Sequence, residues 1–123
     1  MKREESMENK IDQILASVFQ RRFKSITEEM GLTLLRTTRS PILNEARDFV
    51  TGLYDHQGRM LEQTEYIPVL AFAIQPALEY IVRYFGDNIF EGDVIIHNDV
   101  FSGGNQNNDV AVFKPIFYEG RLI

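Results

Sequence analysis

The 123-residue sequence predicts an α+β domain, and three features of the chain support this prediction. Apolar residues recur at spacings of three and four over residues 11–34, which indicates a long N-terminal amphipathic helix. A turn-forming segment at 55–58 separates two short strand-like stretches, which indicates a β-hairpin. Further along, two apolar stretches enclose a loop rich in Asp, Asn and Gly. We therefore expect one modest core that spans residues 1–123, without a second domain.

The composition is that of an ordinary globular protein. Hydrophobic residues make up 44% of the sequence and charged residues 25%, and the formal net charge is -5. This balance argues against a nucleic-acid partner, because phosphate binding needs clustered Lys and Arg. The lack of cysteine excludes disulfides and thiolate metal sites. There is no apolar stretch of membrane-spanning length and no signal peptide, so we expect a cytoplasmic protein without membrane contact.

The first half of the chain is expected to form the long helix and the hairpin. Residues 1–8 are polar and are expected to be disordered, and Gly31 either ends or weakens the helix. The apolar stripe of this helix should face the core or an interface. Residues 36–41 should connect the helix to the hairpin, because Pro41 disfavours a helical conformation before it. The hairpin strands are predicted over 48–54 and 59–64.

A second helix is predicted over residues 73–85. Pro76 is tolerated only near a first turn, so the helix should begin close to it, and Gly86 is its natural stop. The following stretch, 94–96, lacks alternation, which suggests a strand buried on both faces.

The chain is predicted to end in an unfinished hairpin. Residues 110–117 read as a strand in which Pro115 suggests an edge or a bulge. Residues 118–121 read as a turn, and the strand after it has barely begun at residue 123. We therefore expect the chain to be an incomplete part of a larger domain.

The loop between the last two apolar stretches is the strongest candidate for a functional site. Asp99 and Asp109 flank a run of amides that includes Gln106, and carboxylate and amide oxygens can together bind a hard cation. These residue types also form loops by bonding their own backbone, so the spacing leaves both roles open. His97 lies where the strand meets the loop. The sequence leaves three roles open for it: a base, a metal ligand, or a strand-end residue whose ring is hydrogen-bonded to the backbone.

Other candidate motifs are weaker. Arg47 and Asp48 at the start of the first strand form either a substrate clamp or an ion pair at a sheet end. Ser40 and Ser102 lack the context of a nucleophile elbow, and the chain has two histidines, so a catalytic triad is not indicated. The paired glycines after Ser102 match no Walker loop and no dinucleotide fingerprint, so we assign no cofactor-binding residues.

An ordered series of motifs resembles the N-terminal part of the hydantoinase B/oxoprolinase family. The resemblance runs from about residue 26 to residue 123, through Leu35-Arg36-Thr37-Thr38-Arg39-Ser40-Pro41, Glu45-Ala46-Arg47-Asp48-Phe49, Tyr54-Asp55-His56-Gln57-Gly58-Arg59, Ile67-Pro68-Val69, Gly92-Asp93-Val94, Asn98-Asp99, Gly103-Gly104 and Asp109-Val110. Family members are several times longer, which implies that this chain is an N-terminal portion of such a domain.

The resemblance implies a part of the B-type subunit of an ATP-dependent cyclic-amide hydrolase of the hydantoinase or 5-oxoprolinase type. It implies a small-molecule substrate and a hetero-oligomer in which the A-type partner holds the ATP, so that the fragment alone is inactive. Two alternatives stay open. One is a subunit of an ATP-dependent acetone or acetophenone carboxylase, and the other is a non-catalytic assembly module whose first helix docks on the A-type subunit. A free-standing binding domain rests on chain length alone.

The resemblance also bears on the site residues. Asp99 and Asp109 match acids of the family motifs, and with Asp48 and His97 they form the expected catalytic set. A divalent metal, Mn, Zn or Mg, would bind Asp99, Asp109 and Gln106. Gln106 stands where the family commonly has histidine, as do Tyr66 and Leu70 in a second motif. An amide oxygen binds transition metals more weakly than imidazole does, so a weaker oxygen-rich site and no metal at all both stay open.

Overall fold

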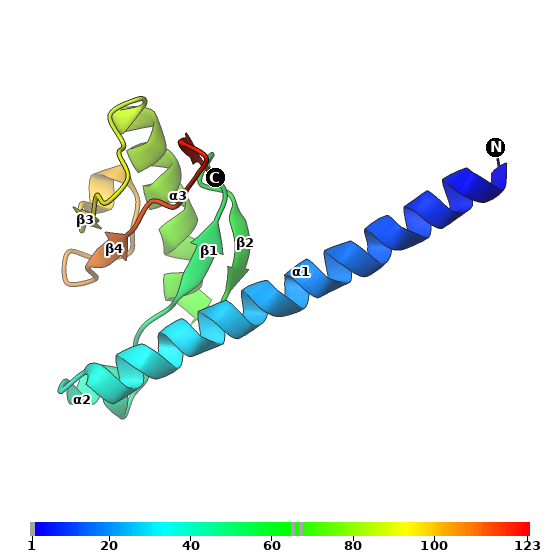
Figure 1. Ribbon diagram of the computed structural model, residues 1–123. Coiled ribbons are helices and arrows are strands. Elements are labelled where there is room, and N and C mark those ends of the chain that lie inside the picture. The colour runs from blue at the N-terminus through cyan, green and yellow to red at the C-terminus, as the bar shows by residue number, and fades with distance from the viewer. Residues whose placement is uncertain (1, 65, 67) are drawn as a thin grey trace.

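The computed structural model of the chain describes residues 2–64, 66 and 68–123, and it has the predicted α+β organisation (Figure 1). Its strands form separate two-stranded antiparallel pairs, β1 with β2, β3 with β4 and β5 with β6. As far as the described residues go, none of the helices is long and apolar enough to cross a membrane. In chain order the elements are α1 (Lys2–Thr37), α2 (Pro41–Asn44), β1 (Gly52–Tyr54), β2 (Met60–Gln63), α3 (Pro68–Phe85), β3 (Ile95–His97), the 3-10 helix η1 (Val100–Ser102), β4 (Ala111–Phe113), β5 (Phe117–Tyr118) and β6 (Arg121–Leu122).

Helix α1 is longer than the sequence predicted. It includes residues 2–8, for which we expected disorder, and it passes through Gly31 to Thr37. Gly31 is buried, and a Cβ at this position would lie 3.2 Å from the Tyr66 hydroxyl oxygen and 3.7 Å from the Phe49 ring. The Phe49 and Tyr66 rings contact each other with centroids 5.0 Å apart. Gly31 therefore does not end the helix; it lets α1 approach this aromatic pair closely.

Polar contacts join α1 to the hairpin. Thr51 Oγ1 donates to the Thr27 carbonyl oxygen (2.8 Å), and Thr51 N donates to Thr64 Oγ1 (3.0 Å). Thr64 N donates in return to the Thr51 carbonyl oxygen (2.8 Å). Thr27 is only 1% exposed, and its hydroxyl donates to the Lys24 carbonyl oxygen (3.0 Å). Buried polar groups are costly unless they are bonded, so this network selects the side of α1 that faces the hairpin.

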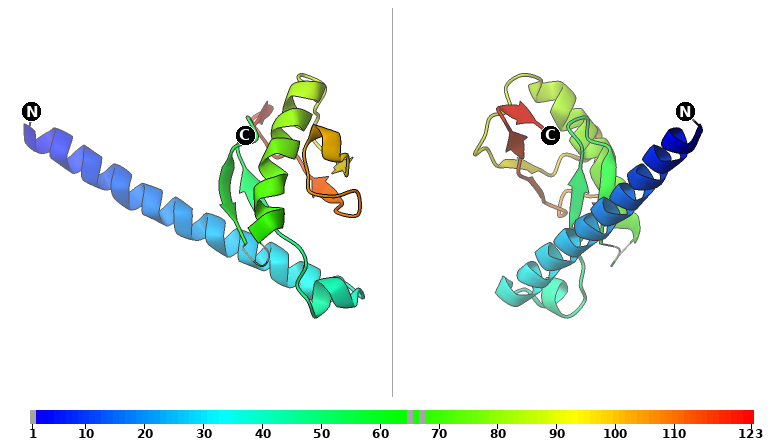
Figure 2. Two further views of the ribbon diagram at one scale, coloured as in Figure 1. Left: turned by 180° about the vertical axis from the view of Figure 1, so that it is seen from behind. Right: turned by 45° about the vertical axis from the view of Figure 1, so that its right-hand side comes forward.

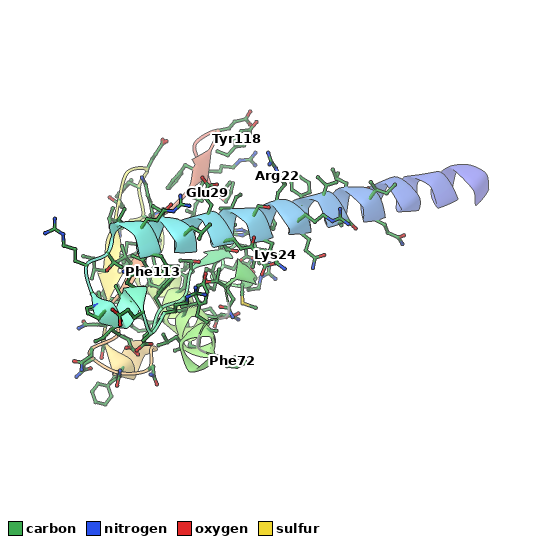
Figure 3. The ribbon with its side chains drawn as sticks, turned by 90° about the horizontal axis from the view of Figure 1, so that it is seen from below. Arg22, Lys24, Glu29, Phe72, Phe113 and Tyr118 are labelled. Atoms are coloured by element: carbon green, nitrogen blue, oxygen red, sulfur yellow. The ribbon has the colours of Figure 1, made fainter. Side chains whose placement is uncertain are left out.

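The N-terminal half of α1 extends well beyond the rest of the molecule (Figures 1 and 2). All residues from 12 to 22 are exposed. At about 100° per residue, four apolar side chains of this segment lie on the side of the helix opposite Thr27 and Gly31. Figure 3 shows Arg22 and Lys24 pointing to opposite sides of α1, as this spacing requires. We call the four apolar residues the exposed stripe: Ile14 (60% exposed), Leu15 (50%), Val18 (51%) and Phe19 (51%).

The predicted β1–β2 hairpin is confirmed. Asp55 organises its turn, because Oδ1 accepts from Gln57 N and Arg59 N, both at 2.9 Å, and Oδ2 accepts from Arg59 Nε at 2.7 Å. Strand β1 begins at Gly52 rather than at residue 48. The reason is a tight turn before it, in which Arg47 has a φ of 54° and its carbonyl oxygen accepts from Phe49 N.

Tyr54 gives a prediction about alkaline stability. Burial raises the pKa of its phenol to about 12 in the folded chain, against about 10 when the chain is unfolded. Between these two pKa values the folded state binds more protons than the unfolded state. The contribution of Tyr54 to the free energy of unfolding should therefore be complete below pH 10 and be lost as the pH rises toward 12. We expect urea midpoints to drop between pH 10 and pH 12 by more in the wild type than in Tyr54→Phe. Equal drops in the two proteins would contradict this role for Tyr54.

Helix α3 lies between the hairpin and the loop after β3 (Figures 1 and 2). Two glycines bring these flanking segments against its backbone. A Cβ on Gly58, in the hairpin turn, would lie 2.9 Å from Glu79 N, and a Cβ on Gly103 would lie 2.5 Å from Ala77 N. Ala77 is 1% exposed. The loop is thus anchored on α3 by a close backbone contact that only glycine permits.

The predicted start of this helix near Pro76 is wrong. Helix α3 begins at Pro68, a residue suited to a first turn, and holds Pro76 in its interior. An interior proline lacks the N–H for its intrahelical bond, so the helix tolerates this position at a cost. Burial of Ala71 (5% exposed) on the earlier turns favours the longer helix. The predicted end is confirmed, because Gly86 has a φ of 52° and donates to the Val82 carbonyl oxygen (2.9 Å).

The last strands differ from the prediction in burial and continuity. Ile96 in β3 and Val112 in β4 are paired with each other and are 69% and 63% exposed. The predicted burial of β3 on both faces is therefore wrong. Among the described residues, nothing covers the face of the strand pair that carries these two side chains. The predicted strand over 110–117 is divided into β4 and β5 around Pro115, which cannot donate to a ladder. The predicted turn at 118–121 is confirmed, with positive φ at both central residues.

Candidate functional site

The candidate site is the loop between β3 and β4, residues 98–110, which contains η1. Strands β3 and β4 hold its two ends together through the pairs Ile95 with Phe113 and His97 with Ala111. The anchor at Gly103 fixes its middle against α3. A loop held at both ends and at its centre can present side chains in a defined geometry.

A chain of hydrogen bonds joins three side chains at the start of the loop. Ser102 Oγ donates to Asp99 Oδ2 at 2.7 Å, and His97 Nε2 lies 3.0 Å from the same Ser102 oxygen. Phe101 N donates to Asp99 Oδ1 at 3.0 Å, so Asp99 also caps η1. The bond from Ser102 and then the bond from Phe101 lower the pKa of the Asp99 carboxyl; partial desolvation opposes them and the charge of His97 assists. Asp99 is therefore ionised at neutral pH.

Asp109 belongs to a second group at the end of the loop. Its Oδ2 accepts from Asn105 Nδ2 and its Oδ1 accepts from Gln106 Nε2, both at 3.1 Å. Its backbone N–H donates to the Gln106 carbonyl oxygen at 3.0 Å. Asn98 Nδ2 donates across the loop to the Asn107 carbonyl oxygen at 3.0 Å. The amides thus serve as donors that shape the loop around Asp109.

The structure brings together some of the predicted site residues and leaves others apart. Asp99 and His97 are joined through Ser102, whereas Asp99 and Asp109 accept from separate sets of donors. Asp48 lies between α2 and β1, half-buried, and its backbone N–H donates to the Ile42 carbonyl oxygen (3.1 Å). Among the described residues no hydrogen bond or ion pair links Asp48 to the loop.

The predicted ligands Asp99, Asp109 and Gln106 are hydrogen-bonded to their neighbours in this chain. Both oxygens of Asp99 and both of Asp109 accept N–H or O–H donors, and Gln106 turns its nitrogen rather than its oxygen toward Asp109. No group of three His, Asp or Glu side chains that could hold a metal ion occurs in the part of the chain that the structure describes. Tyr66, at one family histidine position, packs on Phe49 instead. These residues do not form a transition-metal site by themselves.

Ser102 has a role in the site that its immediate sequence context does not indicate. It matches no nucleophile elbow, but its hydroxyl bridges His97 and Asp99. Its position relative to Asp99 could have indicated this role. Ser102 follows Asp99 by three residues, a spacing at which a side chain in a short helical turn can form a hydrogen bond with the residue that caps the turn.

The sequence profile of the hydantoinase B/oxoprolinase family matches residues 12–123, and the chain belongs to this family. It is 38% identical over 115 residues to the beta subunit of caprolactamase from Pseudomonas jessenii. It is 34% identical over 116 residues to 5-oxoprolinase 1 from Arabidopsis thaliana. It is 31% identical over 118 residues to a protein of Pseudomonas sp. strain NS671 that is named as the B-type subunit of a D-/L-hydantoinase.

These alignments cover 94%, 94% and 93% of this chain but only 20%, 9% and 20% of the three relatives. The chain therefore spans about a fifth or less of each relative. No solved structure matches the chain.

Proposed function

We propose that the chain is part of a subunit of an ATP-dependent cyclic-amide hydrolase, to which it contributes the loop of Asp99 and Asp109. The observation that carries the proposal is the family match over residues 12–123. The names of the three relatives refer to caprolactam, 5-oxoproline and hydantoin, all of which contain a ring amide. In this proposal an A-type partner subunit holds the ATP, as the family resemblance implies.

The chemistry of the loop supports this role. Opening a ring amide requires a group that accepts a proton from the attacking water and a group that protonates the departing nitrogen. His97 supplies an imidazole, a side chain often used for proton transfer, and the ionised Asp99 is connected to it through Ser102. Asp109 supplies a second carboxylate in the same loop.

The proposal is tested on the full-length subunit that contains this chain, produced together with an A-type subunit. Phosphate release and ring opening would be measured with 5-oxoproline, hydantoin and caprolactam in turn. We expect ATP hydrolysis to depend on at least one of these compounds and to be coupled to its opened product. ATP hydrolysis that responds instead to acetone or acetophenone with bicarbonate would move the assignment to a ketone carboxylase. No response to any of the five compounds would refute both assignments.

A second role, docking on the partner subunit, is supported by the exposed stripe of α1. Two of the relatives are named as subunits, which implies multi-subunit enzymes. Four neighbouring apolar side chains at 50–60% exposure are a typical anchor for a partner. We propose that the A-type subunit covers this stripe.

Charge placed on the stripe should therefore weaken assembly. We expect Val18→Asp to lower the amount of A-type subunit that co-purifies by at least about tenfold, since a charge buried in an apolar interface costs several kcal/mol. Gln20→Asp is the matched control, because it adds the same charge to an exposed position on the opposite side of α1. Pull-down and analytical ultracentrifugation measure the result, and equal binding by both variants would contradict docking through the stripe.

A further inference from the structure

We propose that Ser102 is a positioning residue that holds the His97 imidazole with its proton on Nε2, so that Nδ1 is the acceptor nitrogen left to face the substrate. The role in catalysis rests on the proposed function. The arrangement of the proton rests on the hydrogen bonds of the loop alone.

The Ser102 hydroxyl has a single proton to donate. Its oxygen lies 2.7 Å from Asp99 Oδ2 and 3.3 Å from the Asp99 carbonyl oxygen, and both of these atoms can only accept. The hydroxyl proton is therefore directed to Asp99. Only the lone pairs of Ser102 Oγ remain for the third neighbour, His97 Nε2, at 3.0 Å.

This assignment determines the tautomer of His97. An imidazole nitrogen that faces a lone pair must carry the hydrogen, so Nε2 is the donor. In the neutral ring Nδ1 is then the acceptor. In the described part of the chain no hydrogen bond reaches Nδ1, which leaves this atom for a water molecule or a substrate nitrogen.

The surroundings make Ser102 a rigid support. It is the last residue of η1, whose first turn is capped by Asp99 through Phe101 N at 3.0 Å. The next residue is Gly103, whose backbone lies against Ala77 of α3. A hydroxyl held between a capped turn and a helix backbone can orient the imidazole without touching the substrate.

The test combines two variants with two measurements. Ser102→Ala removes the hydroxyl, and Ser102→Thr keeps it. In the assembled enzyme we expect Ser102→Ala to lower kcat for ring opening by about 10- to 100-fold with KM within about twofold, by analogy with the loss of a group that orients a metal-bound histidine. Ser102→Thr should retain kcat within about threefold of the wild type. A wild-type kcat in Ser102→Ala, or an equal loss in both variants, would overturn the proposal.

The second measurement does not depend on turnover. Nitrogen-15 NMR of the imidazoles in the 123-residue chain distinguishes the two tautomers, and His56→Gln identifies the His97 signals, because the chain has two histidines. We expect a single Nε2–H form in the wild type and in Ser102→Thr, and a mixture in Ser102→Ala. An Nδ1–H form in the wild type, or an unchanged spectrum in Ser102→Ala, would refute the positioning role. If the wild-type enzyme opens no ring amide, the proposed function fails, while this spectrum still decides the inference.

Discussion

Gly103→Ala is expected to detach the candidate loop from α3 and to abolish ring opening, whereas Gly104→Ala should be much milder. The two positions share the same backbone strain, with φ of 110° and 102°, which costs a non-glycine residue about 1–3 kcal/mol. They differ in the space around a new Cβ. At Gly103 the atom would lie 2.5 Å from Ala77 N and 2.6 Å from Ala77 Cα, while at Gly104 nothing lies within 4 Å.

The collision at Gly103 cannot be relieved by a side chain, because the atoms it meets are the backbone of α3. Overpacking adds typically about 1–3 kcal/mol to the strain, so the loop should detach before the helix moves. Hydrogen exchange of the amides over 98–110 would measure this release. We expect strong loss of protection in Gly103→Ala and little in Gly104→Ala, with α1 unaffected in both. Equal loss in the two variants would show that strain alone controls the loop.

The sequence predicted local structure well where a few neighbouring residues determine it. The hairpin turn follows from Asp55, whose carboxylate accepts two backbone N–H groups within four residues, and from Gly58 at a φ of 85°. The end of α3 follows in the same way from Gly86. Each of these predictions depends on contacts inside a short window, and short windows are what a single sequence displays.

Predictions that depend on distant contacts were less successful. Pro76 resembles a helix start in its local context, but α3 begins earlier because Ala71 and Ala77 are buried by other elements. The periodic apolar residues predict α1, yet they do not identify its packed side. That side carries Thr27, which bonds to Thr51 before the hairpin, and Gly31, whose lack of a side chain leaves room for Phe49 and Tyr66. The exposed stripe faces away from it.

In the candidate loop, one feature could be predicted from the local sequence and another could not. Its position between two strands followed from the pattern of apolar residues, and Asp99 and Asp109 are in it as predicted. The directions of their side chains did not follow, because spacing along a loop says nothing about which donors each carboxylate meets. The two acids belong to separate hydrogen-bonded groups, and Ser102 connects Asp99 to His97.

Removal of the Asp99 charge should strongly lower turnover without detaching the loop. In Asp99→Asn the remaining oxygen can still accept from Phe101 N, so the cap of η1 is kept while the carboxylate that orders Ser102 and His97 is lost. We expect kcat for ring opening to fall by about 10²- to 10⁴-fold, the usual contribution of a positioned acid–base group. Co-purification of the partner subunit should not change, because the exposed stripe is on the distant half of α1.

A matched control is available in the turn just before β3. Asp93 Oδ2 accepts from Phe90 N at 2.8 Å, so Asp93→Asn removes a carboxylate of similar structural role outside the loop. We expect Asp93→Asn to keep kcat within about threefold of the wild type, since it removes no acid–base group from the loop. Full turnover and normal assembly in both Asp99→Asn and Asp109→Asn would exclude a catalytic part for the loop. In that case the chain would contribute assembly alone, because the stripe could still hold the partner while the reacting groups came from elsewhere in the enzyme.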